Sequence, residues 1–377
     1  MRRHHVILVG CFFVFAELLC RLAMPWLVPA SGLAAVDLLL GRAAERRRFR
    51  AHPYLLYENT PHFTEHGRVQ HNALGYRGPE MRVQRQDGVT RILALGGSTT
   101  YGWKLEDPRE AWPFQLEQAL RGRGLRVEVV NSGLPSATSA ELLARWIFRD
   151  RYLKPDIVII HGPGNDVWPL MYPGYDPEYT HYRKTWEALP YGRRAGEEVL
   201  LSSAVARVAY GWWLYASHAS LGIFRDPTLF PALSAQEALH NVQSNRPDGF
   251  ERNLTLLVRS IQADGAKPLL FKMLRAPKEV FRRLPPAARS AEPLYDAVRL
   301  AHEKEGAVVE RVAAALSVSW IEIPESTVPL DYFLDHAHLD ARGERLKAAL
   351  LADRMEALIS SLPSAAPHVE VGRVDGR

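Results

Sequence analysis

Apolar and polar positions along the 377-residue chain predict an N-terminal apolar helix, followed by short apolar runs that alternate with helical patterns. Five short runs are dominated by aliphatic side chains. They comprise residues 91–95, 127–130, 156–160, 268–272 and 318–323. Nearly continuous apolar strands of this kind are typical of a parallel sheet that is covered on both faces.

Helical periodicity occupies the gaps between these runs. Residues 295–316 and 342–358 repeat apolar side chains at helical spacing. Asp107 is a predicted helix cap, with Pro108 at the first helical position and Glu110 three residues after the cap. Strands that alternate with helices predict a three-layer α/β/α sandwich with a five-stranded parallel sheet, of flavodoxin-like type. In such sheets, functional sites lie at the carboxyl ends of the strands.

The first 27 residues form the predicted signal anchor or transmembrane segment. Residues 6–27 would span about 33 Å as a helix, enough for the hydrocarbon core of a bilayer. Glu17 and Arg21 interrupt the stretch, but their spacing allows them to pair on one helix face. Arg2 and Arg3 precede it, so the positive-inside rule predicts a single-pass protein with a cytoplasmic N-terminus and an extracytoplasmic catalytic domain, in the periplasm or at the cell surface.

Three other interpretations of this segment remain open. Val28, Pro29 and Ala30 lie where a signal peptidase could cleave. Leu8, Val9 and Gly10 precede Cys11 in an order compatible with a lipoprotein signal, and the segment could also be a buried structural helix.

Composition and charge narrow the protein class. Apolar residues make up 47% and charged residues 24%, as in ordinary globular proteins. The net charge of +5 is too small to indicate a nucleic-acid-binding protein. Both cysteines, Cys11 and Cys20, fall in the apolar segment, which excludes a disulfide or a cysteine-ligated metal in the remainder.

The chain therefore has four predicted regions. A lead-in at residues 28–90 follows the anchor, and the catalytic domain covers residues 91–361 with an aromatic-rich insertion at about 167–250. A tail at residues 362–377 is rich in Pro, Ala, Gly and charge, which predicts disorder.

Polar residues that follow the apolar runs are the candidates for chemistry. Ser98 comes directly after the first run and two glycines, although a serine here could also only cap a helix. Gly133 follows the second run and Asn165 the third, and both offer N–H groups suited to a developing oxyanion. Asp335 and His338 lie three residues apart near the end of the domain. An imidazole that accepts the proton of a serine, and a carboxylate that orients it, form the catalytic triad of serine hydrolases.

A metal site is the alternative for the last segment. Asp335, His336, His338 and Asp340 are suitable ligands, but no further cluster of His and Asp supplies another anchor. We therefore predict neither a metal nor another cofactor.

Taken in chain order, these residues resemble the SGNH/GDSL hydrolase superfamily over roughly residues 70–360. The resemblance makes Ser98 the nucleophile, Asp335 and His338 its partners in the triad, and Ser98, Gly133 and Asn165 the oxyanion hole. Two departures stand out: the Gly-Asp-Ser-Leu sequence typical of the family is Gly-Gly-Ser-Thr at residues 96–99, and Pro163 replaces a glycine two residues before Asn165.

The segment Asn-Ala-Leu-Gly-Tyr-Arg-Gly at residues 72–78, together with the N-terminal span, resembles a bacterial membrane-anchored subgroup linked to surface polysaccharide. The resemblance implies a serine esterase that removes an O-acyl group, such as acetyl, from a carbohydrate or another extracytoplasmic ester. An O-acyltransferase that acts on a surface polysaccharide, and a catalytically vestigial membrane-tethered polysaccharide-binding or assembly protein, are the alternatives.

The insertion is rich in tyrosine and tryptophan between residues 168 and 215. Such rings combine an apolar face with a polar tip, so they predict a surface that stacks on sugar rings. Core packing, or a position at a membrane interface, would explain the same residues.

Overall fold

The computed structural model describes residues 2–29, 48–52, 54–162, 164–182, 202–216, 233–289 and 291–362. The chain divides into two compact units, one made of Met1–Phe63 with Arg183–Ala232 and the other of Thr64–Tyr182 with Leu233–Arg377. Apart from Leu362, the predicted tail lies outside the described residues, and so does Pro163.

The first unit contains the N-terminal helix α1 (Arg2–Leu27). Within α1, Leu8–Leu27 is long and apolar enough to cross a membrane, and the same length and composition are also typical of a signal sequence. The predicted pair within this helix forms, because Arg21 Nε donates to Glu17 Oε1 at 2.9 Å. In the same unit, β1 (Phe49–His52) and β2 (Leu56–Asn59) form an antiparallel pair.

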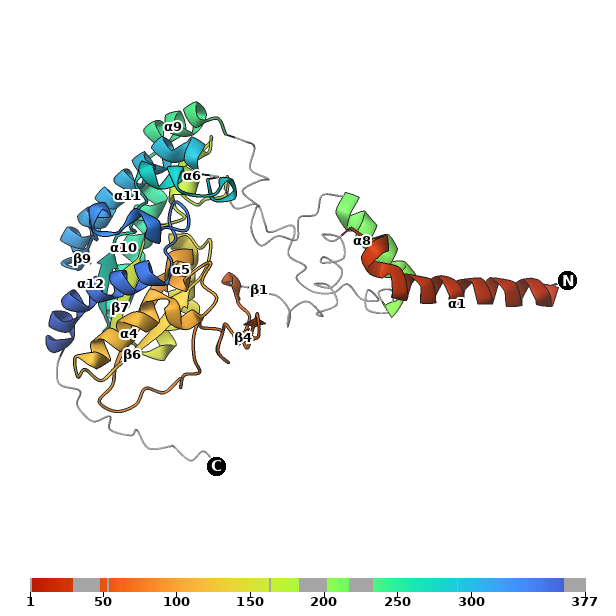
Figure 1. Cartoon of the computed structure of the whole chain (residues 1–377), viewed down its shortest axis with the longest axis horizontal. Helices are drawn as coiled ribbons and strands as arrows, with labels where there is room; N and C mark the ends of the chain where they lie inside the picture. The colour runs from red at the N-terminus through yellow and green to blue at the C-terminus, as the bar shows by residue number, and fades with distance from the viewer. Residues whose placement is uncertain are drawn as a thin grey trace. The chain divides into compact units, whose positions relative to one another are not determined.

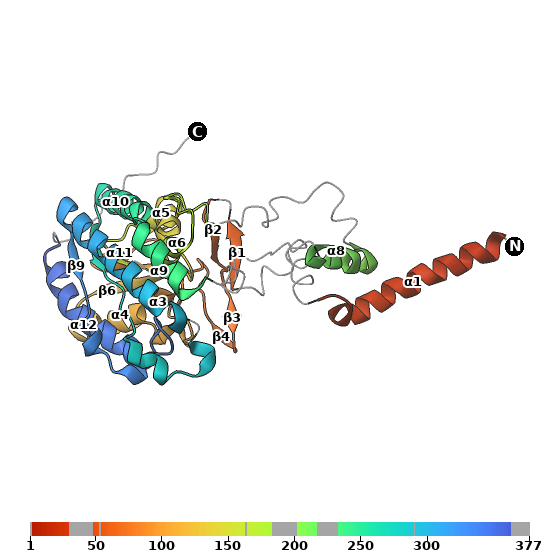
Figure 2. The same cartoon turned by 90° about the horizontal axis from the view of Figure 1, so that it is seen from above.

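Glu17 has a second role that the sequence did not indicate. Its carboxylate accepts hydrogen bonds from the backbone amides of Ala204 and Val205, at 2.8 and 3.2 Å, at the start of α8 (Ala204–Ala216). An acidic group at a helix N-terminus satisfies amides that have no partner within the helix. At the other end of α8, Trp212 Nε1 donates to the carbonyl of Leu27 at 2.7 Å, so α8 runs beside the second half of α1 (Figure 2).

The second unit is built on a five-stranded parallel sheet in the order β6-β5-β7-β8-β9. The strands are β5 (Thr90–Gly96), β6 (Val127–Gly133), β7 (Ile157–His161), β8 (Lys267–Phe271) and β9 (Ser319–Ile321). Each coincides with a predicted apolar run. The predicted three-layer α/β fold is therefore confirmed.

Helices cover both faces of this sheet (Figures 1 and 2). On one face lie α4 (Trp112–Gly122) and α12 (Ala341–Ser360), and on the other lie α5 (Ser139–Phe148), α10 (Asp248–Ala263) and α11 (Tyr295–Leu316). Successive residues of a strand pack against opposite helix layers. Ile157 and Ile159 join the core beneath α4 and α12, whereas Ile160 faces the opposite layer.

The predicted helices at residues 295–316 and 342–358 are confirmed by α11 and α12. The start predicted at Asp107 is only partly right. Asp107 does cap a helix, by accepting from the amide of Arg109, but this helix is the single 3-10 turn Pro108–Glu110. Ala111 is extended, so the α-helix begins only at Trp112.

The lead-in residues from Thr64 onward belong to the second unit. Asn72 Oδ1 accepts from the amides of Leu74 and Tyr76, both at 3.0 Å, which closes a tight turn. The turn buries Tyr76, whose hydroxyl donates to Asp150 Oδ1 at 2.7 Å. The segment at residues 72–78 is thus fixed to the catalytic domain by its own polar groups.

Shorter elements complete this unit. They are β3 (Thr64–Glu65), β4 (Arg68–Val69), α3 (Ser98–Tyr101), α6 (Val167–Met171), α9 (Ala235–Ser244) and the 3-10 turns Asp150–Leu153, Lys278–Arg282, Pro286–Ala288, Glu292–Leu294, Glu325–Thr327 and Leu330–Tyr332.

Candidate active site

Ser98 is the first residue of α3, directly after β5 and the connecting Gly97. Gly96 is required at the strand end, since a side chain there would lie 2.2 Å from Thr100 Oγ1 and 2.9 Å from the carbonyl oxygen of His161. The amide of Ser98 belongs to the first turn of a helix, where N–H groups have no intrahelical acceptor. The turn therefore presents both a hydroxyl and an amide at the carboxyl edge of the sheet.

The loop before α12 brings His338 to this serine. His338 Nε2 lies 2.8 Å from Ser98 Oγ, and Nδ1 lies 2.9 Å from both carboxylate oxygens of Asp335. Asp335 Oδ1 also accepts from the amides of Ala337 and His338, at 2.9 and 2.8 Å, so the three-residue spacing forms a tight turn. Three of the predicted site residues thus form one hydrogen-bonded chain, although 240 positions separate Ser98 from His338.

The electrostatic surroundings keep Asp335 ionised. Burial alone would raise its pKa, but the hydrogen bond and charge of His338, the nearby His336 and the Lys104 ammonium hold the pKa well below its usual range. An ionised carboxylate can only accept, so Nδ1 of His338 carries the proton and Nε2 is left to accept from Ser98.

Lys104 is the site residue that sequence reasoning missed. Its Nζ lies 2.6 Å from Asp335 Oδ2, and its side chain is 37% exposed. The residue adopts a left-handed backbone conformation, with φ of 73°, in the turn after α3. Nothing in the sequence distinguishes this lysine from a solvated surface residue, because the contact depends on a loop more than 200 positions away.

Asn165 lies on the other side of the serine turn. Its Nδ2 donates to the carbonyl of Ala137 at 2.9 Å and would lie 3.0 Å from a Cβ atom on Gly97. The side-chain amide is therefore next to the residue that precedes Ser98. The second hydrogen of Nδ2 has no acceptor among the residues that the structure describes.

Gly133 has surroundings that differ from those expected of an oxyanion donor. Its amide donates to Asn131 Oδ1 at 2.9 Å, so this N–H group is already engaged. A Cβ atom at this position would lie 2.2 Å from the amide nitrogen of Tyr101. The glycine is required because the backbone of α3 crosses β6 at this point.

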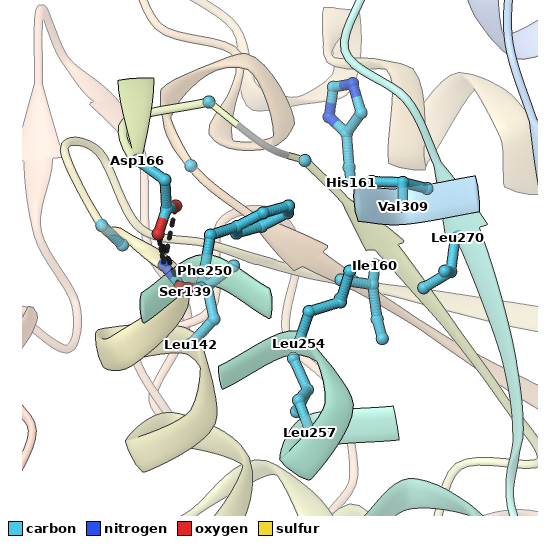
Figure 3. Close-up of a pocket in the computed structure, with 14 residues that line it drawn as sticks. Ser139, Leu142, Ile160, His161, Asp166, Phe250, Leu254, Leu257, Leu270 and Val309 are labelled. Atoms are coloured by element: carbon cyan, nitrogen blue, oxygen red, sulfur yellow. Dashed lines mark hydrogen bonds between the residues drawn. The ribbon is translucent and has the colours of Figure 1, made fainter. Parts of the chain in front are cut away.

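Asp166 anchors the turn that carries Asn165. Its carboxylate accepts from the amide and hydroxyl of Ser139, at 2.9 and 2.5 Å (Figure 3). It also accepts from the hydroxyl of Tyr179 at 2.8 Å. Burial raises the pKa of Asp166 to about 6, although these hydrogen bonds act in the opposite direction. The turn is thereby tied to the N-terminus of α5 and to the start of the insertion.

A small apolar cavity, partly open to solvent, lies beneath this turn (Figure 3). Its rim includes Gly97, Gly164 and Asp166. Its walls are mostly aliphatic or aromatic and come from both helices and strands. They comprise Leu142, Ile160, Phe250, Leu254, Leu257, Leu270 and Val309. The cavity thus adjoins the residues that flank both Ser98 and Asn165.

The side chains considered as metal ligands are used in other ways. Asp340 caps α12 by accepting from the amides of Arg342 and Gly343. Burial lowers the pKa of His336. Within the described part of the chain, no three His, Cys, Asp or Glu side chains are grouped so that they could hold a metal ion.

Several aromatic residues of the insertion are not positioned as a free surface. Tyr179 is 2% exposed and Tyr182 8% exposed, and the Tyr175 hydroxyl accepts from the amide of Gly249. Tyr179 and Tyr182 are therefore core residues, which is the alternative that the sequence left open, whereas Tyr175 is only partly buried. Trp168 is only partly buried and its ring meets that of His336 edge-on, with centroids 6.4 Å apart.

Tyr210, Trp212 and Trp213 lie on α8 in the first unit, whereas Trp186 and Tyr191 lie outside the described residues.

The model of the GDSL-like lipase/acylhydrolase family matches residues 94–346, which include every residue of the hydrogen-bonded chain at Ser98. The chain belongs to this family. It is therefore an ester-hydrolysing enzyme, and the family predicted from the sequence is confirmed. No protein of curated function is similar enough to the chain to be matched.

Solved structures of GDSL-like enzymes resemble the chain at low identity. A GDSL-like lipase from Bacteroides thetaiotaomicron is 15% identical, with a TM-score of 0.38, and the match covers 71% of this chain and 89% of the lipase. A variant of an acetyl xylan esterase from Geobacillus stearothermophilus is 16% identical, with a TM-score of 0.41, over 70% of this chain and 93% of that enzyme.

Proposed function

We propose that this GDSL-like enzyme is a serine esterase that removes O-acyl groups from carbohydrate, with Ser98, His338 and Asp335 as its catalytic triad. The observation that carries the proposal is the continuous hydrogen-bonded chain from Ser98 Oγ through His338 to Asp335. A serine hydroxyl is a weak nucleophile until a base removes its proton, and this geometry supplies the base and the group that orients it.

The reaction follows from these contacts. His338 Nε2 takes the Ser98 proton while Oγ attacks the ester carbonyl carbon, which gives a tetrahedral oxyanion. The imidazolium then returns the proton to the leaving alcohol oxygen, and the acyl group stays on Ser98. Water, deprotonated by the same nitrogen, attacks the acyl-enzyme and releases the carboxylic acid and the free serine.

For the oxyanion we propose the amide of Ser98 and the side chain of Asn165 as donors. The Ser98 amide is at the start of a helix, and Asn165 lies against the serine turn. We leave Gly133 out, because its amide donates to Asn131. Two donors directed at the position where charge develops lower the barrier to the tetrahedral state.

The cavity beneath Gly97 and Gly164 supports an ester whose acyl part is apolar, because most of its walls are aliphatic or aromatic. We place the polar alcohol part towards Trp168, whose ring meets that of His336 edge-on. A partly buried tryptophan beside polar groups suits a sugar ring. The proposed substrate is accordingly an acylated, for example acetylated, carbohydrate.

Activity on two esters tests this function. We expect the full chain to hydrolyse 4-nitrophenyl acetate and an acetylated oligosaccharide, and Ser98→Ala to hydrolyse neither while its circular dichroism stays unchanged. Turnover by a folded Ser98→Ala protein would refute the triad. Hydrolysis of the aryl ester alone would refute only the carbohydrate assignment.

We further propose that α1 anchors the enzyme in a membrane with the catalytic unit outside the cytoplasm. The apolar part of α1 begins after Arg2 and Arg3, and positive charge favours the cytoplasmic side. Reporters fused after residue 60 test this topology. We expect alkaline phosphatase to be active and green fluorescent protein to be dark at that position, and the reverse pattern would contradict the orientation.

A further inference from the structure

Arg77 belongs to the lead-in segment at residues 72–78, to which the proposed reaction gives no role. The residue is 4% exposed, and its amide donates to the carbonyl of Asn131 at 3.2 Å, near the end of β6. Asn131 Nδ2 in turn donates to the carbonyl of Thr100 at 2.9 Å, within α3. The segment is thus joined to the short helix that begins at Ser98.

The guanidinium of Arg77 holds the end of this helix. Its Nη1 donates to the hydroxyl of Tyr101 at 3.0 Å, and its Cζ lies 4.2 Å from the centroid of the Tyr101 ring. Tyr101 is fully buried and is the last residue of α3. His71 Nε2 lies 2.8 Å from the same hydroxyl, so the lead-in contacts Tyr101 twice. A guanidinium combines a planar stack with directed hydrogen bonds, which the ammonium of a lysine cannot reproduce.

The other arm of the guanidinium holds the turn that carries Lys104. Arg77 Nη2 donates to the carbonyl of Leu105 at 2.8 Å, one residue after Lys104. Nη1 also donates to Gln70 Oε1, and Gln70 Nε2 donates to the carbonyl of Glu106 at 2.8 Å. One buried group therefore joins α3 to the turn from which Lys104 reaches the carboxylate of the proposed triad.

These contacts reach Ser98 through the backbone. The carbonyl of Ser98 accepts from the amides of Gly102 and Trp103, both at 3.0 Å. The turn that Arg77 holds is therefore hydrogen-bonded to the proposed nucleophile itself. Misplacement of a reacting group by about 1 Å can cost about 10²-fold in rate, so the position of this turn bears on catalysis.

We infer that Arg77 is a positioning residue, whose single guanidinium fixes both the serine turn and the Lys104 ammonium. The inference rests on the proposed triad and adds to it a residue that acts through two contacts rather than on the substrate. Loss of the contact with Tyr101 should misplace Ser98 and lower kcat. Loss of the contact with Leu105 should move Lys104 away from the triad carboxylate and change the pH dependence.

Arg77→Lys in the full chain tests both consequences, because lysine keeps the charge but cannot make the stack and both hydrogen bonds at once. With 4-nitrophenyl acetate we expect kcat to fall about tenfold or more, with little change in KM. The acid limb of kcat/KM should move upward by as much as about 0.7 pH units. This is the shift expected from a partly screened charge within about 5.5 Å of the imidazole.

A double substitution separates the two contacts. In a Lys104→Met protein, adding Arg77→Lys should lower kcat as before, because the contact with Tyr101 is still lost. The acid limb should not move further, since the charge that Arg77 positions is already absent.

Arg91→Lys is the matched control. Arg91 is also a buried arginine, 1% exposed, and its Nη1 donates to the carbonyls of Val83 and Leu153. It lies near the start of β5, whereas Ser98 follows the end of that strand. Arg91→Lys should therefore lower stability but leave kcat and the acid limb near their wild-type values.

Tyr101→Phe tests the inference even if Arg77→Lys does not fold. It keeps the buried ring and removes the hydroxyl that Arg77 and His71 share, while the contact of Arg77 with Leu105 remains. We expect kcat to fall and the acid limb to stay in place.

A folded Arg77→Lys protein with wild-type kcat and acid limb would overturn the inference. Equal changes in Arg77→Lys and Arg91→Lys, or an unchanged kcat in folded Tyr101→Phe, would overturn it as well. A shift of the acid limb that persists in the Lys104→Met protein would refute the positioning of Lys104. Failure of the proposed function gives a different result, namely a wild-type enzyme without esterase activity or a Ser98→Ala protein that retains it.

Discussion

Replacing Lys104 by methionine tests how charge around Asp335 sets the pH range of catalysis. Lys104 Nζ lies 2.6 Å from Asp335 Oδ2, and the same oxygen lies 2.9 Å from His338 Nδ1. The ammonium is therefore within about 5.5 Å of the imidazole. Lys104 therefore opposes a positive charge on the ring, whereas Asp335 favours it. Without the lysine, activity on the acid side should be lost at a higher pH.

The size of this effect follows from the separation and the exposure. Two unit charges about 5.5 Å apart repel by about 0.8 kcal/mol in water and by about 3 kcal/mol at an effective dielectric constant of about 20. Because Lys104 is 37% exposed, solvent screens it and the lower half of this range applies. About 1 kcal/mol corresponds to a shift of about 0.7 pH units.

The assay is the pH dependence of kcat/KM for 4-nitrophenyl acetate at low salt. We expect the midpoint of the acid limb to move upward by about 0.7 pH units in Lys104→Met. The plateau should change little, since the Ala337 and His338 amides still hold Asp335.

Lys154→Met is the matched control. Lys154 also has a left-handed backbone conformation, with φ of 49°, but it precedes β7 at the opposite edge of the sheet. An unmoved acid limb in Lys104→Met, or an equal shift in Lys154→Met, would refute the electrostatic argument.

Three further predictions concern the oxyanion donor and the core. Asn165→Ala should lower kcat by about 10²-fold or more with little change in KM, the usual effect of losing one such donor, and a normal kcat would remove Asn165 from the site. Asp150→Asn should lower the free energy of unfolding by about 3–5 kcal/mol, because it leaves Arg145, fully buried and 3.2 Å from Asp150, without its counter-charge. The control is Asp353→Asn at an exposed position, which should lower the free energy of unfolding in urea by less than about 1 kcal/mol. Equal losses in Asp150→Asn and Asp353→Asn would contradict this account. Relative to Asp166→Asn, wild-type stability should fall by about 2 kcal/mol as pH rises from about 4 to 6, since the folded-state pKa of Asp166 is raised to about 6, and a pH-independent difference would contradict it.

The strands and the longer helices were predictable because their information is local. A run such as residues 92–95 is apolar throughout, and only a sheet covered on both faces buries it fully. The order of the strands in the sheet is not local. It depends on which helices share a face, so the position of β5 between β6 and β7 came only from the structure.

The residues of the proposed triad could be located in the sequence for a similar reason. Ser98 follows a strand through two glycines, and Asp335 with His338 fits one tight turn, so each feature can be recognised within a few positions. Gly133 shows the limit of this reasoning, because its proximity to Asn131 and Tyr101 depends on how α3 crosses β6. The contact of Lys104 with Asp335 joins two distant loops, for which the sequence contains no local signal.

Labelling with a fluorophosphonate probe tests the central claim most directly. The probe reacts only with a serine that a neighbouring base has activated, so it reports the assembled triad without any assumption about the substrate. We expect one equivalent of probe on the full chain, located by peptide mapping on Ser98, and loss of labelling in both Ser98→Ala and His338→Ala. Labelling at another residue, or undiminished labelling of the folded His338→Ala protein, would contradict the account.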